Sequence, residues 1–184
     1  NSDRRSRGTR FTNTRAGVEA VIRRSFDAAL AYRAAITQFD KDKADGKQPR
    51  PLRRDLRLEA LASILEGSIW VHSHCYRADE IVRMLTVAEE YGFRVAVLQH
   101  VLEGYRLIPE MLRHGAAAST FSDWWAYKIE AWEAIPHNAA RMAQGGVVAT
   151  VNSDSAEVGR HLNLEAAKSM RFGGLSPNDA LRLC

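Results

Sequence analysis

The sequence contains few of the residues that mark secreted, fibrous or membrane-spanning chains. Its 184 residues include only two cysteines, Cys75 and Cys184, and five prolines, so neither a disulfide-stapled scaffold nor a collagen-like chain is indicated. No apolar run approaches the roughly 18 residues that a membrane span requires. The arginines of the opening NSDRRSRGTR are not followed by a hydrophobic signal core. We therefore expect a soluble chain with no membrane partner, in a compartment that the sequence leaves open.

The composition is that of a globular protein with a basic start. The chain is 46% hydrophobic and 26% charged, with a formal net charge of +4, and its length fits the prior of about one domain per 150 residues. The first 24 residues are rich in arginine, at positions 4, 5, 7, 10, 15, 23 and 24. Such an arm can bind an anion or a nucleic acid, and we keep that as an alternative function. Phe11 is the one aromatic residue among these arginines, and a base-stacking platform requires several, so no nucleic-acid partner is expected.

Apolar spacing predicts two helices early in the chain. In residues 16–46, apolar side chains recur every three or four positions almost without helix breakers, which predicts a long amphipathic helix. The polar segment KDKADGKQPRP then reads as an exposed turn. A second helix is expected between an N-cap at Asp55 and a stop at Gly67.

Beyond this point, short apolar runs alternate with helical patterns. The runs cover residues 68–74, 94–100, 116–120 and 147–154. The helical patterns cover residues 78–92, 104–115, the segment PHNAARMAQGG, residues 162–172 and a last helix capped by Ser176. Short buried strands alternating with helices predict an α/β fold with a parallel sheet.

Polar residues follow these strands at regular intervals. His74 and His100 each end an apolar run and lie 26 residues apart, and Asp154 ends another run 54 residues further on. A (β/α)₈ barrel has a repeat of about 31 residues and carries its chemistry at the C-terminal strand ends. We therefore expect residues 1–184 to form part of such a barrel, roughly strands 5 to 8 with their helices. A doubly wound sheet is the alternative, and its ligand would also lie beyond the strand ends.

The residues at these strand ends are of the type that binds metals. Imidazole and carboxylate groups are the usual ligands of Zn²⁺ and its first-row neighbours, and a catalytic site takes them from separate rigid elements. The sequences VHSH, LQH and NSD supply such a set. Along a strand, residues two apart share a face, so His72 and His74 point the same way and either is a candidate ligand.

Five segments of the chain resemble successive parts of the amidohydrolase superfamily, particularly its imidazolonepropionase-like and prolidase-like branch: IWVHSHCYRADEI, VLQHVLEGY, ASTFSDWWAYKIEA, VVATVNSDSAE and GGLSPNDALRL. The resemblance covers almost the whole chain and implies a distorted (β/α)₈ barrel with one or two divalent metals, with Zn preferred. It makes His74 and His100 the metal ligands of the fifth and sixth strands. It makes Asp154 the eighth-strand residue that binds metal and moves the proton. His72 stays an alternative ligand or a substrate contact.

The resemblance also fixes which part of the barrel is present. The HSH at residues 72–74 is similar to the HxH of the family's first strand, but seven further βα units of about 30 residues do not fit into the remaining 110 residues. As the fifth strand, it implies the C-terminal half of the barrel. The first-strand HxH, the bridging Lys or Glu of the fourth strand and the flanking β-sandwich are then absent from this sequence. Half a barrel leaves sheet edges open and the metals short of ligands, so we expect it to be inactive alone.

The activity that the resemblance implies is metal-dependent hydrolysis of C–N bonds in a small amide, peptide or cyclic amide. Bound metal lowers the pKa of water and polarises a carbonyl group, and Asp154 would serve as general base and then general acid. A non-catalytic barrel protein that binds a small molecule is the rival interpretation. A homo-oligomer is compatible with either interpretation.

Residues on the loops after the strands are candidates for contacting the substrate. Tyr76 and Arg77 follow His74, and Tyr105 lies in the loop after His100. Trp124, Trp125, Tyr127 and Lys128 follow the seventh strand and could form a pocket or lid. Aromatic packing is the alternative for the rings, and a structural salt bridge is the alternative for Arg77.

Overall fold

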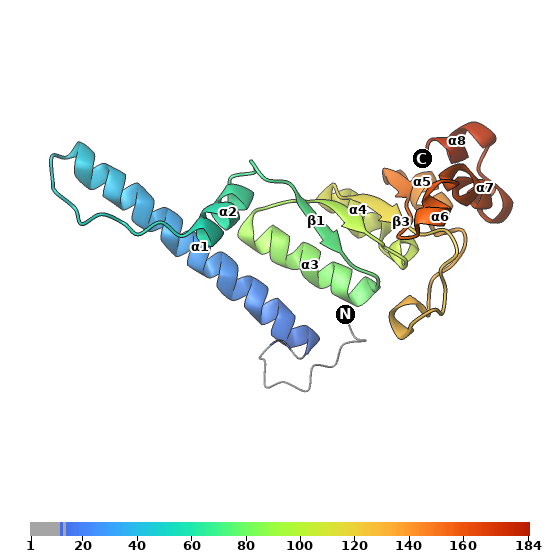
Figure 1. Cartoon of the computed structure of the whole chain (residues 1–184), viewed down its shortest axis with the longest axis horizontal. Helices are drawn as coiled ribbons and strands as arrows, with labels where there is room; N and C mark the ends of the chain where they lie inside the picture. The colour runs from blue at the N-terminus through green and yellow to red at the C-terminus, as the bar shows by residue number, and fades with distance from the viewer. Residues whose placement is uncertain (1–11, 13) are drawn as a thin grey trace. The chain divides into compact units, whose positions relative to one another are not determined.

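The computed structural model describes residue 12 and residues 14–184 (Figure 1). These residues form two compact units. The first contains the described residues up to Trp70 together with residues 90–93, and the second contains residues 71–89 and 94–184. Most of the arginine-rich start, at positions 4, 5, 7 and 10, lies outside the described residues.

The first unit contains the two predicted helices. The long helix α1 spans Arg15–Ala44, and α2 spans Leu56–Leu65. The Asp55 side chain accepts hydrogen bonds from the backbone N–H groups at the start of α2, as an N-cap does. Near the start of α1, Arg23 forms ion pairs with Glu19 and Glu90. The charge of the Arg23 guanidinium is therefore paired with carboxylates of the same unit.

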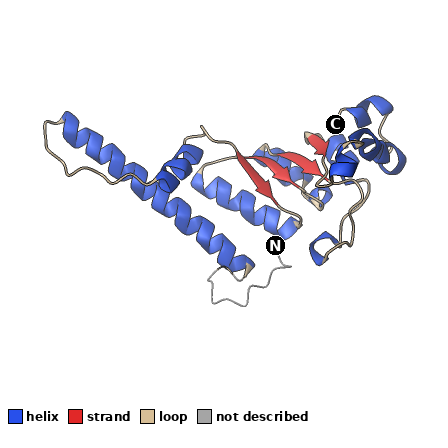
Figure 2. Ribbon diagram, in the orientation of Figure 1, coloured by secondary structure: helices blue, strands red, loops and turns tan. Residues whose placement is uncertain are grey.

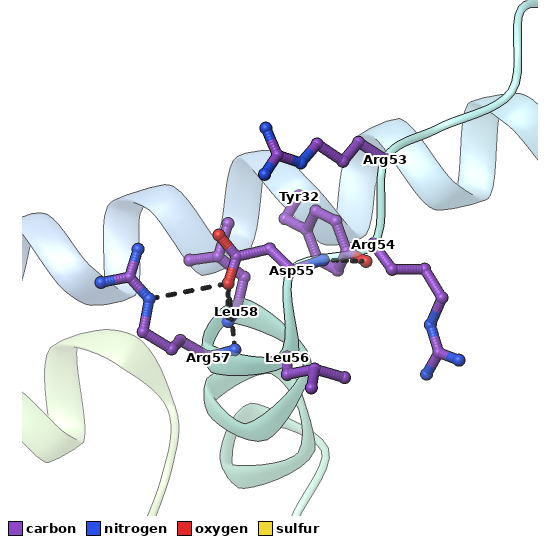
Figure 3. Close-up of a pocket in the computed structure, with 7 residues that line it drawn as sticks. All are labelled: Tyr32, Arg53, Arg54, Asp55, Leu56, Arg57 and Leu58. Carbon is purple, nitrogen blue, oxygen red and sulfur yellow. Dashed lines mark hydrogen bonds and ion pairs between the residues drawn. The ribbon is translucent and has the colours of Figure 1, made fainter.

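Aromatic stacking and hydrogen bonds hold the first unit together. The ring of Phe26 on α1 stacks on Phe93, with centroids 4.5 Å apart. The Tyr32 hydroxyl donates to Glu59 over 3.1 Å, and Arg54 binds the same carboxylate through two nitrogens. An open pocket of about 680 Å³ lies here, lined by Tyr32 and residues 53–58 (Figure 3).

The second unit is built on a parallel sheet of four strands, which confirms the predicted α/β class. The strands are β1 (Val71–His74), β2 (Val95–Gln99), β3 (Ala117–Thr120) and β4 (Ala149–Val151). They lie side by side in chain order, β1-β2-β3-β4 (Figure 2). All four coincide with runs that the sequence pattern indicates.

Helices and short 3₁₀ turns follow the strands: α3 (Ala78–Tyr91), η1 (Gly104–Arg106), α4 (Ile108–His114), η2 (Ile129–Ala131), α5 (Asn138–Gln144), α6 (Ala156–Gly159), α7 (Leu162–Gly173) and α8 (Pro177–Leu181). Only the last two residues of α3 belong to the first unit. The Ser176 side chain caps α8 as predicted. No helix of residues 14–184 is both long enough and apolar enough to cross a membrane.

Two helix predictions need correction, and one short helix was not predicted. The single helix expected over residues 104–115 is two, η1 and α4, because Pro109 has no N–H to donate and the hydrogen-bond ladder cannot pass through it. The next helix, α5, begins at Asn138 rather than at Pro136, with His137 as its N-cap residue. The short helix α6 starts at a Ser155 cap that the sequence pattern did not reveal.

The two faces of the sheet differ in chemistry. Leu98, Ala118 and Val151 point to one face and are buried; on this part of the sheet α5 packs on β3 and β4, and α7 packs on β4. On the other face, one row of residues in register crosses all four strands: His74, Gln99, Ser119 and Thr150. Because side chains alternate along a strand, this second face is polar where the first is apolar. The candidate site lies at the carboxyl end of the polar face.

Candidate active site

Two histidine rings meet at the ends of β1 and β2. The ring centroids of His74 and His100 lie 4.6 Å apart, with the planes at 63°. His100 directly follows β2 and has a φ of 59°, in the left-handed region that costs a residue with a Cβ about 1–2 kcal/mol. Such strain persists only where the surroundings hold it, and it clusters at functional sites.

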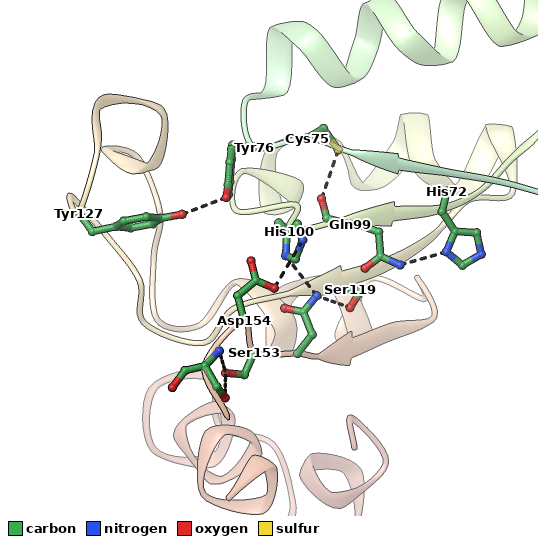
Figure 4. Close-up of polar contacts among 11 residues, drawn as sticks. His72, Cys75, Tyr76, Gln99, His100, Ser119, Tyr127, Ser153 and Asp154 are labelled. Atoms are coloured by element: carbon green, nitrogen blue, oxygen red, sulfur yellow. Dashed lines mark hydrogen bonds and ion pairs between the residues drawn. The ribbon is translucent and has the colours of Figure 1, made fainter. Parts of the chain in front are cut away.

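The imidazole of His100 lies among polar and aromatic neighbours (Figure 4). Its Nε2 lies 3.9 Å from Asp154 Oδ1, and its Nδ1 lies 3.4 Å from the Asn152 amide nitrogen. The ring of Phe121 stacks on it at a centroid distance of 4.7 Å. Burial is the largest effect on the pKa of His100 and lowers it. The nearby Asp154 carboxylate raises this pKa by less, and His74 lowers it further, so the pKa stays below its ordinary value. The ring is therefore neutral at pH 7, as a metal ligand must be.

The donor chemistry of this group suits a divalent metal ion, although the set is incomplete. His74, His100 and Asp154 offer two imidazoles and a carboxylate from three strand ends. Beside them, the buried side-chain oxygen of Asn152 has no hydrogen-bond partner among the described residues. Within residues 14–184, however, no three His, Cys, Asp or Glu side chains converge closely enough to hold a metal. A metal site at these three residues therefore stays a prediction.

His72 occupies a different place from His74. It pairs with Val97, whereas His74 pairs with Gln99, two residues further along the strands. The His72 Nδ1 lies 3.0 Å from the side-chain nitrogen of Gln99. The geometry therefore favours His74 as the partner of His100, and the assignment of the ligand stays a prediction.

An aromatic cluster, formed by Tyr76, Phe121, Trp124 and Tyr127, packs against the two histidines. Tyr76 meets His74 edge-on at 5.0 Å, and Trp124 stacks on Phe121 at 4.4 Å. The Tyr127 hydroxyl donates to the Tyr76 hydroxyl over 3.0 Å (Figure 4). Two predicted substrate contacts, Tyr76 and Trp124, thus lie in the cluster around the histidine pair.

The other two predicted substrate contacts have partners elsewhere. The Arg77 guanidinium binds Asp79 through two nitrogens, at 2.9 and 3.2 Å, which is the structural ion pair that the sequence left open. The Tyr105 hydroxyl donates to the Glu133 carbonyl and accepts from Arg106. Contact of Arg77 or Tyr105 with a substrate stays a prediction.

Sequence reasoning missed two residues that support His100. Asn152 also donates to the Ser119 hydroxyl over 2.7 Å, so its amide joins β3 to the site. Asn152 lies two residues before Asp154 in NSD, and the alternation of a strand could have identified it. Phe121 carries no comparable signal, because a phenylalanine after a strand is usually core.

Comparison with known proteins points to one family. No family model matches the chain. Over 185 aligned residues it is 28% identical to amidohydrolase tasK of Hapsidospora irregularis, a match that covers 92% of this chain. The crystal structure of an amidohydrolase from Thermotoga maritima MSB8 matches 95% of the chain with a TM-score of 0.80 and 24% identity. Both matched proteins are named amidohydrolases, so the chain is similar to members of the amidohydrolase superfamily. The chain spans 18% of the length of the curated relative and 44% of the solved chain.

Proposed function

We propose that this chain supplies the metal-binding half-site of a metal-dependent amidohydrolase of the imidazolonepropionase-like or prolidase-like branch, which hydrolyses C–N bonds in small amides, peptides or cyclic amides. One observation carries the proposal. The His100 ring lies between His74, at a centroid distance of 4.6 Å, and Asp154, whose Oδ1 lies 3.9 Å from Nε2. These side chains come from the ends of three parallel strands, which is where barrel hydrolases carry their chemistry.

The sheet topology supports residues 1–184 as the C-terminal half of a (β/α)₈ barrel. The four strands follow one another in chain order without the reversal that a doubly wound sheet requires. The row from His74 to Thr150 makes one face polar, whereas parallel sheets with helices on both faces carry near-continuous apolar strands. Both features favour a barrel whose polar face lines the interior.

The site residues divide the work as follows. His74, His100 and Asp154 would hold one or two divalent ions, with Zn²⁺ preferred by the nitrogen donors. An ion held there supplies Lewis-acid activation of water and of the substrate carbonyl. Asp154, with a side chain 56% exposed, is accessible to the attacking water. Its carboxylate would take the proton and then deliver it to the leaving nitrogen.

Metal analysis of the full-length protein, with the other half of the barrel present, tests this proposal. We expect about one or two divalent ions per chain, with the content reduced in His74→Ala, His100→Ala and Asp154→Asn. His137→Ala is the matched control, because this imidazole belongs to the N-cap residue of α5 and not to a strand end. His72→Ala separates the two candidate ligands and should retain the metal. Unchanged content in both His100→Ala and Asp154→Asn would refute the proposal.

A hydrolysis assay of the same full-length protein separates the enzyme from a non-catalytic binding protein. Removing the metal with a chelator should abolish cleavage of a panel of N-acyl amines and dipeptides, and adding Zn²⁺ should restore it. Bound metal without cleavage of any amide in the panel would instead favour a barrel that only binds a small molecule.

A further inference from the structure

Tyr76 lies between the histidine pair and a fixed positive charge. Its ring is buried and meets His74 edge-on at 5.0 Å. On the ring face, the ammonium of Lys128 lies 4.0 Å from the centroid, within the range of a cation–π interaction. Lys128 also lies 5.2 Å from the Tyr127 ring centroid and 3.4 Å from Glu130 Oε2. Two rings and a carboxylate thus hold the ammonium against Tyr76.

The Lys128 side chain keeps its positive charge at neutral pH. Partial burial lowers the pKa of Lys128, but its interactions with Tyr76 and Tyr127 outweigh burial and leave that pKa above its ordinary value. The Lys128 side chain is only 16% exposed, so its charge acts on Tyr76 with little screening by solvent.

The two phenols leave one proton available for a further acceptor. Each hydroxyl carries a single donor, and the 3.0 Å bond from Tyr127 to Tyr76 uses one of the two protons. Burial, together with this hydrogen bond, raises the pKa of Tyr127 to about 12, so Tyr127 stays protonated and can donate. The Tyr76 O–H is then free to donate elsewhere, and accepting a hydrogen bond strengthens it as a donor.

We propose that the Tyr76 hydroxyl donates a hydrogen bond to the substrate carbonyl oxygen as negative charge develops on it. In this assignment Tyr76 is a catalytic residue, and Tyr127 and Lys128 are positioning residues that orient the phenol and increase its donor strength. Donors fixed before the reaction act strongly where charge develops in a partly water-excluded site. The inference rests on the proposed amide hydrolysis, because it assumes that a carbonyl reacts beside His74 and His100.

Tyr76→Phe is the sharpest test, because it removes only the hydroxyl and keeps the ring under Lys128. For amides that the full-length protein hydrolyses, we expect kcat to fall about 100- to 1000-fold with KM nearly unchanged. Tyr127→Phe and Lys128→Met should give smaller losses of the same kind, and Lys128→Arg should recover most of the activity. Tyr91→Phe is the control, because it removes a phenol that bonds Asp27 in the first unit.

A binding measurement keeps the inference testable without turnover. Methylphosphonate is the probe for a tetrahedral, anionic carbonyl centre and acetamide the probe for a planar one, with tryptophan fluorescence as the signal. Tyr76→Phe should weaken methylphosphonate binding about tenfold or more and leave acetamide binding unchanged. This selective loss would support the inference even if no amide were cleaved and the proposed hydrolysis failed. If Tyr76→Phe left both amide hydrolysis and methylphosphonate binding unchanged, the inference would be overturned, and the proposed function would still stand.

Discussion

The imidazole of His100 lies parallel to the ring of Phe121, with the two planes inclined by only 21° and the centroids 4.7 Å apart. Phe121 is itself 1% exposed and stacks on Trp124. A ligand ring must be held in one orientation, and a buried aromatic face restricts its rotation. Phe121 therefore supports the site from the apolar side, while Asn152 and Asp154 contact the ring nitrogens.

Phe121→Ala is expected to destabilise the protein by about 3–5 kcal/mol, the usual cost of emptying a buried phenylalanine position. It should also reduce the metal content, because His100 loses the ring that orients it. Phe172→Ala is the matched control: this ring is 52% exposed on α7, and its loss should change stability by less than about 0.5 kcal/mol. Urea denaturation of both variants gives the comparison, and equal shifts would contradict the assignment.

Asn138, at the start of α5, joins this helix to β3 and to the connection after β2, and we expect its substitution to destabilise the protein as well. Its side chain accepts from the Tyr105 N–H at 2.8 Å and donates to the Val101 carbonyl and the Thr120 hydroxyl. Asn138→Ala would leave the Tyr105 N–H unpaired, at about 1–3 kcal/mol, whereas the Val101 carbonyl would still accept from the Gly104 N–H. Because the hydrogen bonds to Val101 and Thr120 are lost as well, at about 1 kcal/mol each, we expect a total loss of at least about 2 kcal/mol. Asn163→Ala, at an exposed position of α7, should be nearly neutral in the same denaturation assay.

Much of the fold was predictable because hydrophobic periodicity reports local structure. All four strands and the helices α1, α2, α3 and α7 lie where the apolar spacing places them. The errors cluster at prolines: Pro109 divides one predicted helix, and Pro136 lies before a helix that was expected to start there. A proline limits where a helix can continue, but tertiary packing decides on which side the helix forms.

The site was predictable only in part, because sequence spacing shows which residues end strands and not which side chains meet. His74, His100 and Asp154 could be identified from their regular spacing at the ends of apolar runs. The structure brings the His100 ring close to the other two side chains. The left-handed turn at His100 and the stacking of Lys128 on Tyr76 depend on contacts between segments far apart in sequence. No spacing rule encodes such contacts.

The ion pair between Arg54 and Glu59 should make the stability of the first unit fall at acid pH. Hydrogen bonding to Arg54, assisted by Tyr32, holds the pKa of Glu59 below its ordinary value. A carboxylate with a lowered folded-state pKa stabilises the fold above its unfolded pKa of about 4.3, and this stability is lost as the pH falls through the folded-state value. Glu59→Gln should therefore be less stable than the parent at pH 7, with the gap closing as the pH falls below about 4. Arg54→Gln should behave similarly; a gap independent of pH would show that the pair contributes nothing electrostatic.

The left-handed backbone at His100 allows strain to be separated from chemistry. His100→Gly and His100→Ala both remove the imidazole and should both lose metal, but only alanine retains the Cβ that a φ of 59° disfavours. His100→Gly should therefore be more stable than His100→Ala by about 1 kcal/mol. In a helix the order reverses: Ala167→Gly at an exposed position of α7 should lose about 0.5–1 kcal/mol. Denaturant midpoints measure all three variants, and an alanine variant as stable as the glycine variant would mean that the backbone at residue 100 is unstrained. The expected order would show that retaining a histidine there costs stability that the imidazole's role in the site offsets.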